Sequence, residues 1–316
     1  MRRALTGGER PAALTLAALL ALVALIAPAF FSPANLRDLV LANAAIQIMA
    51  VGMTLIVLTG HVDVSVGATF TVSAIVCGVL ARDGVPMPVA ALGALAIAGL
   101  LGLVSGVLVG ALGLPSIVVT LAMLVIVRDG LRWITEGAWV RDLPAGFQWF
   151  GLGQSGGQVV VLLVTVAIVA LAAWGLDRIA AGRALYATGS DPESARLAGL
   201  DPRRIVLGTF VVSGLLAGLA GILNAVRFAE VQGAVVPGIE LKVIAAVIVG
   251  GTAITGGRGS MLGTVLGVAL LGAIGTGLTF LGVSAYWERA LQGAIILAAI
   301  LSESLAARQR VRVARA

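Results

Sequence analysis

Residues 58–69 read LTGHVDVSVGAT and interrupt an otherwise apolar part of the chain. Valines alternate there with His61, Asp63 and Ser65, so polar and apolar side chains follow one another with a period of two. That period is typical of an extended chain rather than of a helix. In a membrane an extended backbone is tolerated only inside protein or beside water. The stretch therefore predicts a buried break between two membrane helices.

The apolar runs around this stretch continue along the whole chain. Of the 316 residues, 59% are hydrophobic and 11% are charged, whereas a soluble domain carries about 25% charged residues. Continuous runs of this kind suit helices and exclude a membrane β-barrel, whose strands alternate. We therefore predict an all-α polytopic membrane protein with about ten transmembrane helices, at residues 12–31, 39–59, 64–81, 88–110, 115–131, 158–176, 205–226, 242–256, 261–281 and 286–305.

The arginines predict the orientation of these helices. With an even number of spans, 13 of the 21 basic residues fall on one side, which is cytoplasmic by the positive-inside rule. The prediction is a single transmembrane domain over residues 1–316, with both termini cytoplasmic. Its cytoplasmic parts are two short basic tails, 1–11 and 306–316, and a loop at 177–204. This asymmetry accounts for the net charge of +6, and no nucleic-acid partner is expected.

Two further features concern the ends and faces of the spans. The first run, preceded by Met-Arg-Arg, is too long for a typical signal peptide and is expected to stay as an uncleaved helix. Four Arg-Asp pairs are expected at the ends opposite the cytoplasm, at 37–38, 82–83, 128–129 and 141–142. Glycines at four-residue spacing, as in Gly102, Gly106 and Gly110, predict close helix packing.

The chemistry of an enzyme is missing from the sequence. One cysteine and one histidine provide neither a disulfide framework, nor a metal cluster, nor a nucleophile with its base. A phosphate-binding loop needs a lysine in a glycine-rich motif, and Lys242, the only lysine, lacks that context. Energy for transport must then come from a partner protein or from an ion gradient. Acidic side chains expected within spans are few, namely Asp63, Glu288 and Glu303, which disfavours a gradient without excluding it.

The cytoplasmic loop contains a helix start signal. Gly189-Ser190-Asp191-Pro192 predicts a turn followed by a short helix over 192–199, capped by Asp191 or Ser190 and ended by Gly199. Glu193 in its first turn suits the helix dipole. Such a helix, polar on one side and small on the other, suits the docking of another protein or forms a simple structured loop.

Several stretches resemble one family of membrane proteins. The chain is similar, from about residue 35 to 300, to the permease subunits of ATP-binding-cassette (ABC) importers of the ribose type, and within it most to permeases for autoinducer-2 or rhamnose. The stretches that carry the resemblance are LTGHVDVSVGATF (58–70), GRALYATGSDPESARLAGL (182–200), GIELKVIAAVIVGGTAITGGRGSMLGTVLG (238–267) and LGVSAYWERALQGAIILAAI (281–300).

The resemblance implies site residues. The family's E-A-A-x-x-x-G contact with its ATPase maps onto Glu193, Ser194, Ala195, Arg196 and Gly199, with serine in place of the first alanine. Its G-G-x-D-x-S-x-G signature maps onto Gly60, His61, Asp63, Ser65 and Gly67, and its G-G-x-G-S segment covers Gly256, Gly257, Arg258, Gly259 and Ser260. These two segments are the candidate pathway or helix-break residues.

The same resemblance implies a function and partners. It implies a permease in the bacterial inner membrane that moves a small sugar or sugar-like solute. The partners would be cytoplasmic ABC ATPase subunits, a second or sister permease, an extracytoplasmic solute-binding protein and the lipid bilayer. The chain would bind no cofactor itself, because ATP and Mg belong to the ATPase. A stand-alone secondary transporter or channel is the alternative. Asp63 either only caps the helix that follows or also lines the solute route.

Overall fold

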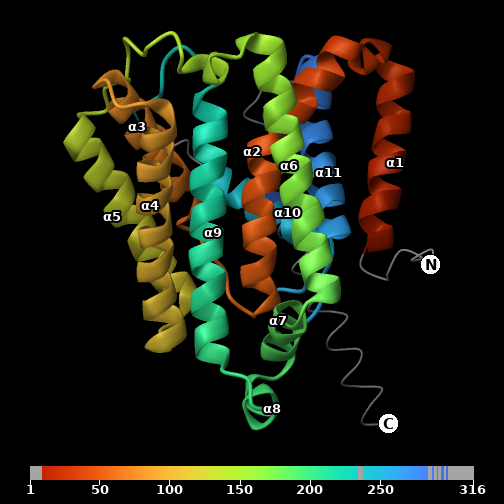
Figure 1. Cartoon of the computed structure of the whole chain (residues 1–316). Helices are drawn as coiled ribbons and strands as arrows, with labels where there is room; N and C mark the ends of the chain where they lie inside the picture. The colour runs from red at the N-terminus through yellow and green to blue at the C-terminus, as the bar shows by residue number, and fades with distance from the viewer. Residues whose placement is uncertain are drawn as a thin grey trace.

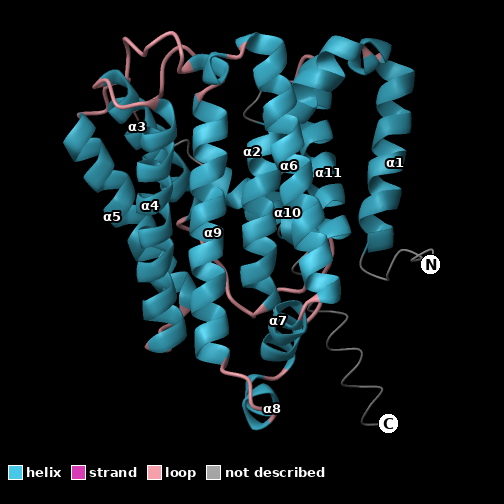
Figure 2. Cartoon of the chain, viewed as in Figure 1, coloured by secondary structure: helices cyan, strands magenta, loops and turns pink. Residues whose placement is uncertain are grey.

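The computed structural model describes residues 9–233 and 238–283, with isolated positions 287, 290, 293, 294 and 297. Figures 1 and 2 show the arrangement, in which every named element is helical. Apart from those isolated positions, the predicted span 286–305, including Glu288 and Glu303, lies outside the described residues, as does the C-terminal tail. The elements are α1 (Glu9–Ile26), η1 (Pro28–Phe31), α2 (Pro33–Leu58), α3 (Val66–Arg82), α4 (Met87–Gly106), η2 (Val107–Ala111), α5 (Ser116–Thr135), η3 (Gln148–Gly151), α6 (Gly153–Arg178), α7 (Ala180–Ser190), α8 (Pro192–Leu197), α9 (Pro202–Ala225), α10 (Ile239–Val249) and α11 (Met261–Phe280).

The helices have the length and composition of a polytopic membrane protein. Within the described ranges, 6 helices are long and apolar enough to cross a bilayer, namely α1, α2, α4 with η2, α6, α9 and α11. The apolar helix α3 is shorter, at 17 residues. Helix α5 carries Arg128, Asp129 and Arg132, and α10 has only 11 residues. The polytopic character is confirmed, and the count of ten spans stays a prediction.

One predicted span ends at a different residue in the structure. The apolar run 242–256 was expected to be a single helix, but α10 begins at Ile239 and ends at Val249. Gly251, with φ +92°, turns the chain away from the helix, in a backbone region that favours glycine. The residues that follow form a second break, which precedes α11.

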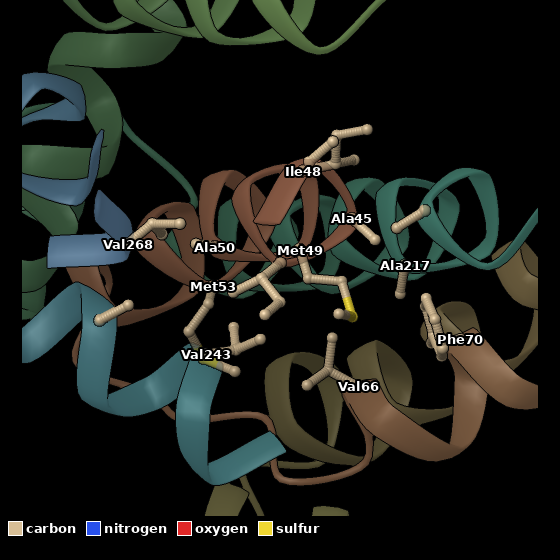
Figure 3. Packing of buried hydrophobic residues seen from close by; sticks show 14 of the residues in the cluster. Ala45, Ile48, Met49, Ala50, Met53, Val66, Phe70, Ala217, Val243 and Val268 are labelled. Atoms are coloured by element: carbon tan, nitrogen blue, oxygen red, sulfur yellow. The ribbon is translucent and has the colours of Figure 1, made fainter. Parts of the chain in front are cut away.

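Helices α2 and α9 form the centre of the bundle (Figure 1). On one side α9 packs against α3 and α4, and on the other side α2 packs against α6, α10 and α11. The core where these helices meet contains Met49 and Met53 of α2, Phe70 of α3 and Val243 of α10, all buried (Figure 3). This core holds α2, α3 and α10 around the two places where the chain leaves helical structure.

The predicted glycine row packs as expected. Helix α4 lies so close to α9 that a β-carbon on Gly102 would be 2.5 Å from the carbonyl oxygen of Phe210. A β-carbon on Gly110 would lie 2.7 Å from the carbonyl oxygen of Arg203. Lipid supplies no hydrophobic force between helices, so this close approach is what stabilises the pair.

Helices α7 and α8 lie at one end of the bundle, beyond α6 and α9 (Figure 1). The predicted helix 192–199 is shorter in the structure, where α8 ends at Leu197. Gly199 has φ +82° and follows the helix as a turn residue. Helix α7 was not predicted, because the loop was interpreted only from its turn signal at 189–192.

Candidate functional site

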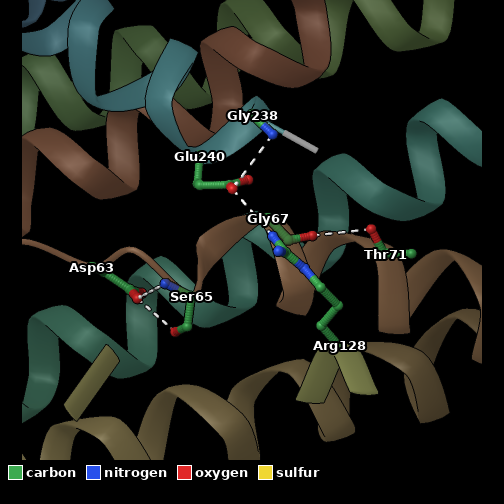
Figure 4. Close-up of polar contacts among 7 residues, drawn as sticks. All are labelled: Asp63, Ser65, Gly67, Thr71, Arg128, Gly238 and Glu240. Atoms are coloured by element: carbon green, nitrogen blue, oxygen red, sulfur yellow. Dashed lines mark hydrogen bonds and ion pairs between the residues drawn. The ribbon is translucent and has the colours of Figure 1, made fainter. Parts of the chain in front are cut away.

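The break between α2 and α3 is a turn held by Asp63. Residues His61–Asp63 are not helical, and Gly60 has φ +80°. The Asp63 carboxylate is buried and its Oδ1 accepts hydrogen bonds from the Ser65 amide at 2.8 Å and the Ser65 hydroxyl at 2.6 Å (Figure 4). The predicted break between the two helices is confirmed, and the chain turns there.

The predicted capping of α3 is wrong. Ser65 occupies the N-cap position of α3, but its side chain makes no capping bond there with any described residue. The Asp63 carboxylate bonds the Ser65 amide, which lies before the first residue of α3. The hydroxyl of Ser65 donates to Asp63, so the two side chains satisfy each other. Asp63 therefore stabilises the turn two residues ahead of it, in the manner of an Asx turn.

Helix α5 supplies hydrogen-bond acceptors for two backbone amides of this break. The Val62 amide donates to the Ser116 hydroxyl at 3.3 Å, and the Val64 amide donates to the Thr120 hydroxyl at 3.1 Å. Ser116 and Thr120 are both buried and lie one helical turn apart on α5. A non-helical backbone at membrane depth needs such partners. Sequence reasoning missed both residues, because each is 54 or more positions away from the amide it binds.

The second break joins α10 to α11 and touches the first. Ala253 donates its amide to the Arg258 carbonyl at 2.9 Å, which closes the loop, and the Ser260 hydroxyl accepts from the Gly263 amide at 3.0 Å to cap α11. The Gly257 amide donates to the Leu58 carbonyl at 2.9 Å, at the end of α2. The two predicted glycine segments are therefore brought together, while the Arg258 side chain is exposed.

The end of α7 lies against both breaks. The Tyr186 hydroxyl donates to the Gly259 carbonyl at 2.8 Å. A β-carbon on Gly189 would lie 2.6 Å from the Gly257 amide nitrogen. Neither Tyr186 nor Gly189 was among the predicted site residues. Both lie within the stretch that carried the resemblance, but their partners are more than sixty residues away, so no local pattern could have identified them.

Helix α8 presents the predicted docking residues at the surface. Asp191 caps it, since its Oδ1 accepts from the amides of Glu193 at 3.0 Å and Ser194 at 3.2 Å. Bonds from Ser194, and from Glu193, hold the pKa of the Asp191 carboxyl below its ordinary value. Arg196 pairs with Glu193 at 2.7 Å on the exposed side. Asp191 is therefore confirmed as the cap, whereas Ser190 is the last residue of α7.

The other residues of α8 divide between the bundle and solvent. Ala195 is buried, whereas Leu197 is 81% exposed. The buried Ala195 side chain packs α8 against the rest of the protein. The exposed Leu197 side chain is left available for contact with another protein. Gly199, after the helix, has no atom within 4 Å of the position of a β-carbon.

An ion pair between α5 and α10 lies beside the first break. Arg128 Nη2 is 3.2 Å from Glu240 Oε1, and the Glu240 side chain is 7% exposed (Figure 4). Sequence reasoning placed Arg128 with Asp129 at the end of a span and did not include Glu240 among the in-span acids. A β-carbon on Gly67 would lie 2.7 Å from Glu240 Oε2. Glycine at position 67 therefore leaves room for the carboxylate between α3 and α10.

These observations show two glycine-rich breaks within a helical membrane bundle, joined to a capped surface helix. The family described as "Branched-chain amino acid transport system / permease component" matches residues 35–300. The chain belongs to this permease family. The predicted resemblance over residues 35 to 300 is confirmed, and the permease is a transport subunit of an ABC import system rather than an enzyme.

Curated relatives cover most of the permease. Ribose import permease protein RbsC of Escherichia coli (strain K12) is 35% identical over 304 residues, 94% of this chain and 94% of that protein. Autoinducer 2 import system permease protein LsrC of Enterobacter sp. (strain 638) is 33% identical over 301 residues, 95% of this chain and 88% of that protein. LsrC of Escherichia coli (strain K12 / DH10B) is 35% identical over 290 residues, 90% of this chain and 85% of that protein. No solved structure matches the permease.

Proposed function

We propose that the chain is the membrane subunit of an ATP-driven importer for a small sugar or sugar-like solute in the bacterial inner membrane. The solute class follows from the relatives, which are import permeases for ribose and for autoinducer 2. The observation that carries the proposal is the placement of the surface helix α8, whose neighbour α7 bonds the second break through Tyr186. A permease that hydrolyses no ATP needs such a connection between its docking surface and its interior.

The proposed contact with the ATPase is α8 and the turn after it. Glu193, Ser194, Ala195, Arg196 and Gly199 would form it, as the family pattern implies. Leu197, at 81% exposed, adds an apolar side chain that a partner would cover. The cap by Asp191 keeps the first turn of α8 in place at the surface. The ATPase would bind ATP and Mg, and this chain would bind neither.

The proposed orientation puts α7, α8 and both termini in the cytoplasm, with ten spans in total. Arginines support it, since Arg183, Arg196, Arg203 and Arg204 are exposed on and between α7, α8 and the start of α9. Glu9, at the start of α1, hydrogen-bonds to Ser260, which follows the second break. The start of α1 and the α7 end of the bundle are therefore on the same side.

The proposed solute route passes the first break. Asp63 and Ser65 are buried polar groups there, and Gly60, His61 and Gly67 complete the segment. The second break, from Gly256 to Gly259, supports the first from the cytoplasmic end. A second or sister permease and an extracytoplasmic solute-binding protein would complete the importer.

The experiment that tests the proposal is uptake by proteoliposomes. The permease is reconstituted with the ATPase and the binding protein that accompany it, and labelled ribose is offered as the first solute. Uptake is expected only when ATP, the ATPase and the loaded binding protein are all present. Uptake by the permease alone, driven by an imposed proton or sodium gradient, would contradict the proposal and support a secondary transporter.

A further inference from the structure

Three backbone segments meet closely at the end of α7, beside the side chain of Ser190. We call this meeting point the glycine junction, formed by Leu58, Gly60, Gly189, Gly256 and Gly257. The Gly257 amide donates to the Leu58 carbonyl at 2.9 Å, which joins the two breaks. Gly189 of α7 lies against this bond, because its β-carbon would be 2.6 Å from the Gly257 nitrogen and closer still to the Leu58 oxygen.

Gly256 and Gly257 of the junction are also confined. A β-carbon on Gly256 would lie 2.8 Å from the Gly189 carbonyl oxygen and 2.8 Å from the Gly60 nitrogen. A β-carbon on Gly257 would lie 2.9 Å from the Ser190 Cα. Gly60 and Gly256 also have φ of +80° and +84°, a conformation that side chains other than hydrogen disfavour. Contacts between backbones leave little room for one segment to slide past another, since packed interiors transmit strain rather than absorb it.

Tyr186 adds a second connection one turn earlier on α7. Its hydroxyl donates to the Gly259 carbonyl at 2.8 Å, so α7 holds the second break at two points. At the same end, directly after Gly189 and Ser190, α7 runs into Asp191, the cap of α8. The first break continues from Gly60 to Val62 and Val64, whose amides bond α5. A continuous series of contacts thus runs from α8 through α7 and the junction to the break that contains Asp63.

We propose that Gly189 and Tyr186 are positioning residues that couple movement of α8 to the two breaks. The proposal rests on the proposed function, in which α8 binds the ATPase. When the ATPase displaces α8, α7 moves with it, and the junction transfers that displacement to Leu58 and Gly257 together. Asp63 and Ser65 then change position relative to α5 without touching the ATPase themselves.

The test compares Gly189→Ala with Gly208→Ala in the complete importer. Gly208 is also a helical glycine, in α9, but a β-carbon there would meet nothing within 4 Å. The measurement is the number of solute molecules imported per ATP hydrolysed in proteoliposomes, together with binding of the ATPase and the amount of folded permease. For Gly189→Ala we expect ATPase binding to be kept and import per ATP to fall by about tenfold, within the roughly 5- to 150-fold range of coupling between sites. Gly208→Ala should match the parent.

Tyr186→Phe keeps the ring and removes the hydroxyl that donates to Gly259, so it decides the outcome if Gly189→Ala does not fold. We expect folded protein and ATPase binding like the parent, with import per ATP reduced by a few fold. A merely structural role would lower the amount of folded permease and leave import per ATP unchanged. Parental import per ATP in Tyr186→Phe, or in a folded Gly189→Ala, would overturn the inference. A parent that imports without ATP would instead overturn the proposed function.

Discussion

Arg128 in α5 and Glu240 in α10 form an ion pair across 112 positions of sequence, with Nη2 3.2 Å from Oε1. Arginine and a carboxylate can form two parallel hydrogen bonds, but this pair forms one. Arg128 Nε and Glu240 Oε2 are buried, and neither has a hydrogen-bond partner among the described residues. The Gly238 amide donates to the same Oε1 at 3.4 Å. The pair connects α5, which binds the first break, to the start of the short helix α10.

Removing one charge of this pair should destabilise the permease. Arg128→Met leaves a buried carboxylate without its cation, a change that costs about 3 to 5 kcal/mol in buried pairs. We expect the lower end of that range, because the Arg128 side chain is 36% exposed. Thermal unfolding of the purified protein measures the effect. The double variant Arg128→Met/Glu240→Met should recover most of the loss, and a double variant no more stable than Arg128→Met would show that the pair is not the cause.

Two properties of Asp63, its hydrogen-bond acceptor and its negative charge, can be tested separately by substitution. Asparagine keeps the oxygen that accepts from Ser65, whereas alanine leaves the Ser65 amide and hydroxyl buried and unpaired, at a cost of about 1 to 3 kcal/mol. We expect Asp63→Asn to fold normally with mildly reduced import, and Asp63→Ala to give little folded protein. Asp83→Ala is the control, because Asp83 is exposed and its carboxylate pairs with the neighbouring Arg82. Normal folding and import by Asp63→Leu would show that neither the acceptor nor the charge of Asp63 is needed.

Thr120 supports the break from α5. Thr120→Val removes the hydroxyl that accepts from the Val64 amide, and leaving that amide unpaired should cost about 1 to 3 kcal/mol. The matched control is Thr165→Val, because the Thr165 hydroxyl donates to the Val161 carbonyl in its own helix. Comparison of the two melting temperatures checks the effect. Equal melting temperatures would mean that the break does not depend on α5.

Helix α8 should be needed for the ATPase but not for insertion. Glu193→Lys reverses one charge of the exposed pair with Arg196, and Gly199→Trp puts a bulky side chain where the turn has φ +82°. Both variants should reach the membrane, and co-purification of the ATPase should fall at least severalfold. Gly113→Trp provides the control, since Gly113 is also a turn glycine, with φ +71° and open space around it, but belongs to the turn between η2 and α5. Full ATPase co-purification and import by Gly199→Trp would show that the docking assignment is wrong.

The proposed orientation can be measured by labelling. Single cysteines at Ser190 and Ala145, both exposed, are introduced into a Cys77→Ala background, in which the buried native thiol is absent. A thiol reagent that does not cross the membrane should label position 145 in intact cells and position 190 only in inside-out vesicles. Labelling of both positions in intact cells would contradict the ten-span orientation.

Part of this protein was decided locally, and that part could be predicted from sequence. Continuous apolar runs predicted membrane helices, the alternation around His61 predicted a break, and Asp191 before a proline predicted the start of α8. These features depend on hydrogen bonds and side-chain periods within a few residues, so neighbours in sequence suffice to define them. The family signature added the glycines of both breaks.

The contacts that make a site from these elements depend on tertiary structure alone. Asp63 was expected to cap α3 but holds Ser65, and α5 supplies the hydroxyls that bond other amides of the break. Glu240 finds Arg128, and Gly189 finds Leu58 and Gly257, only after helices far apart in sequence have packed. The sequence around a glycine or a carboxylate does not show whether that residue will face lipid, water or another backbone. The sequence therefore determined the break before α3, whereas packing decided which groups meet at both breaks.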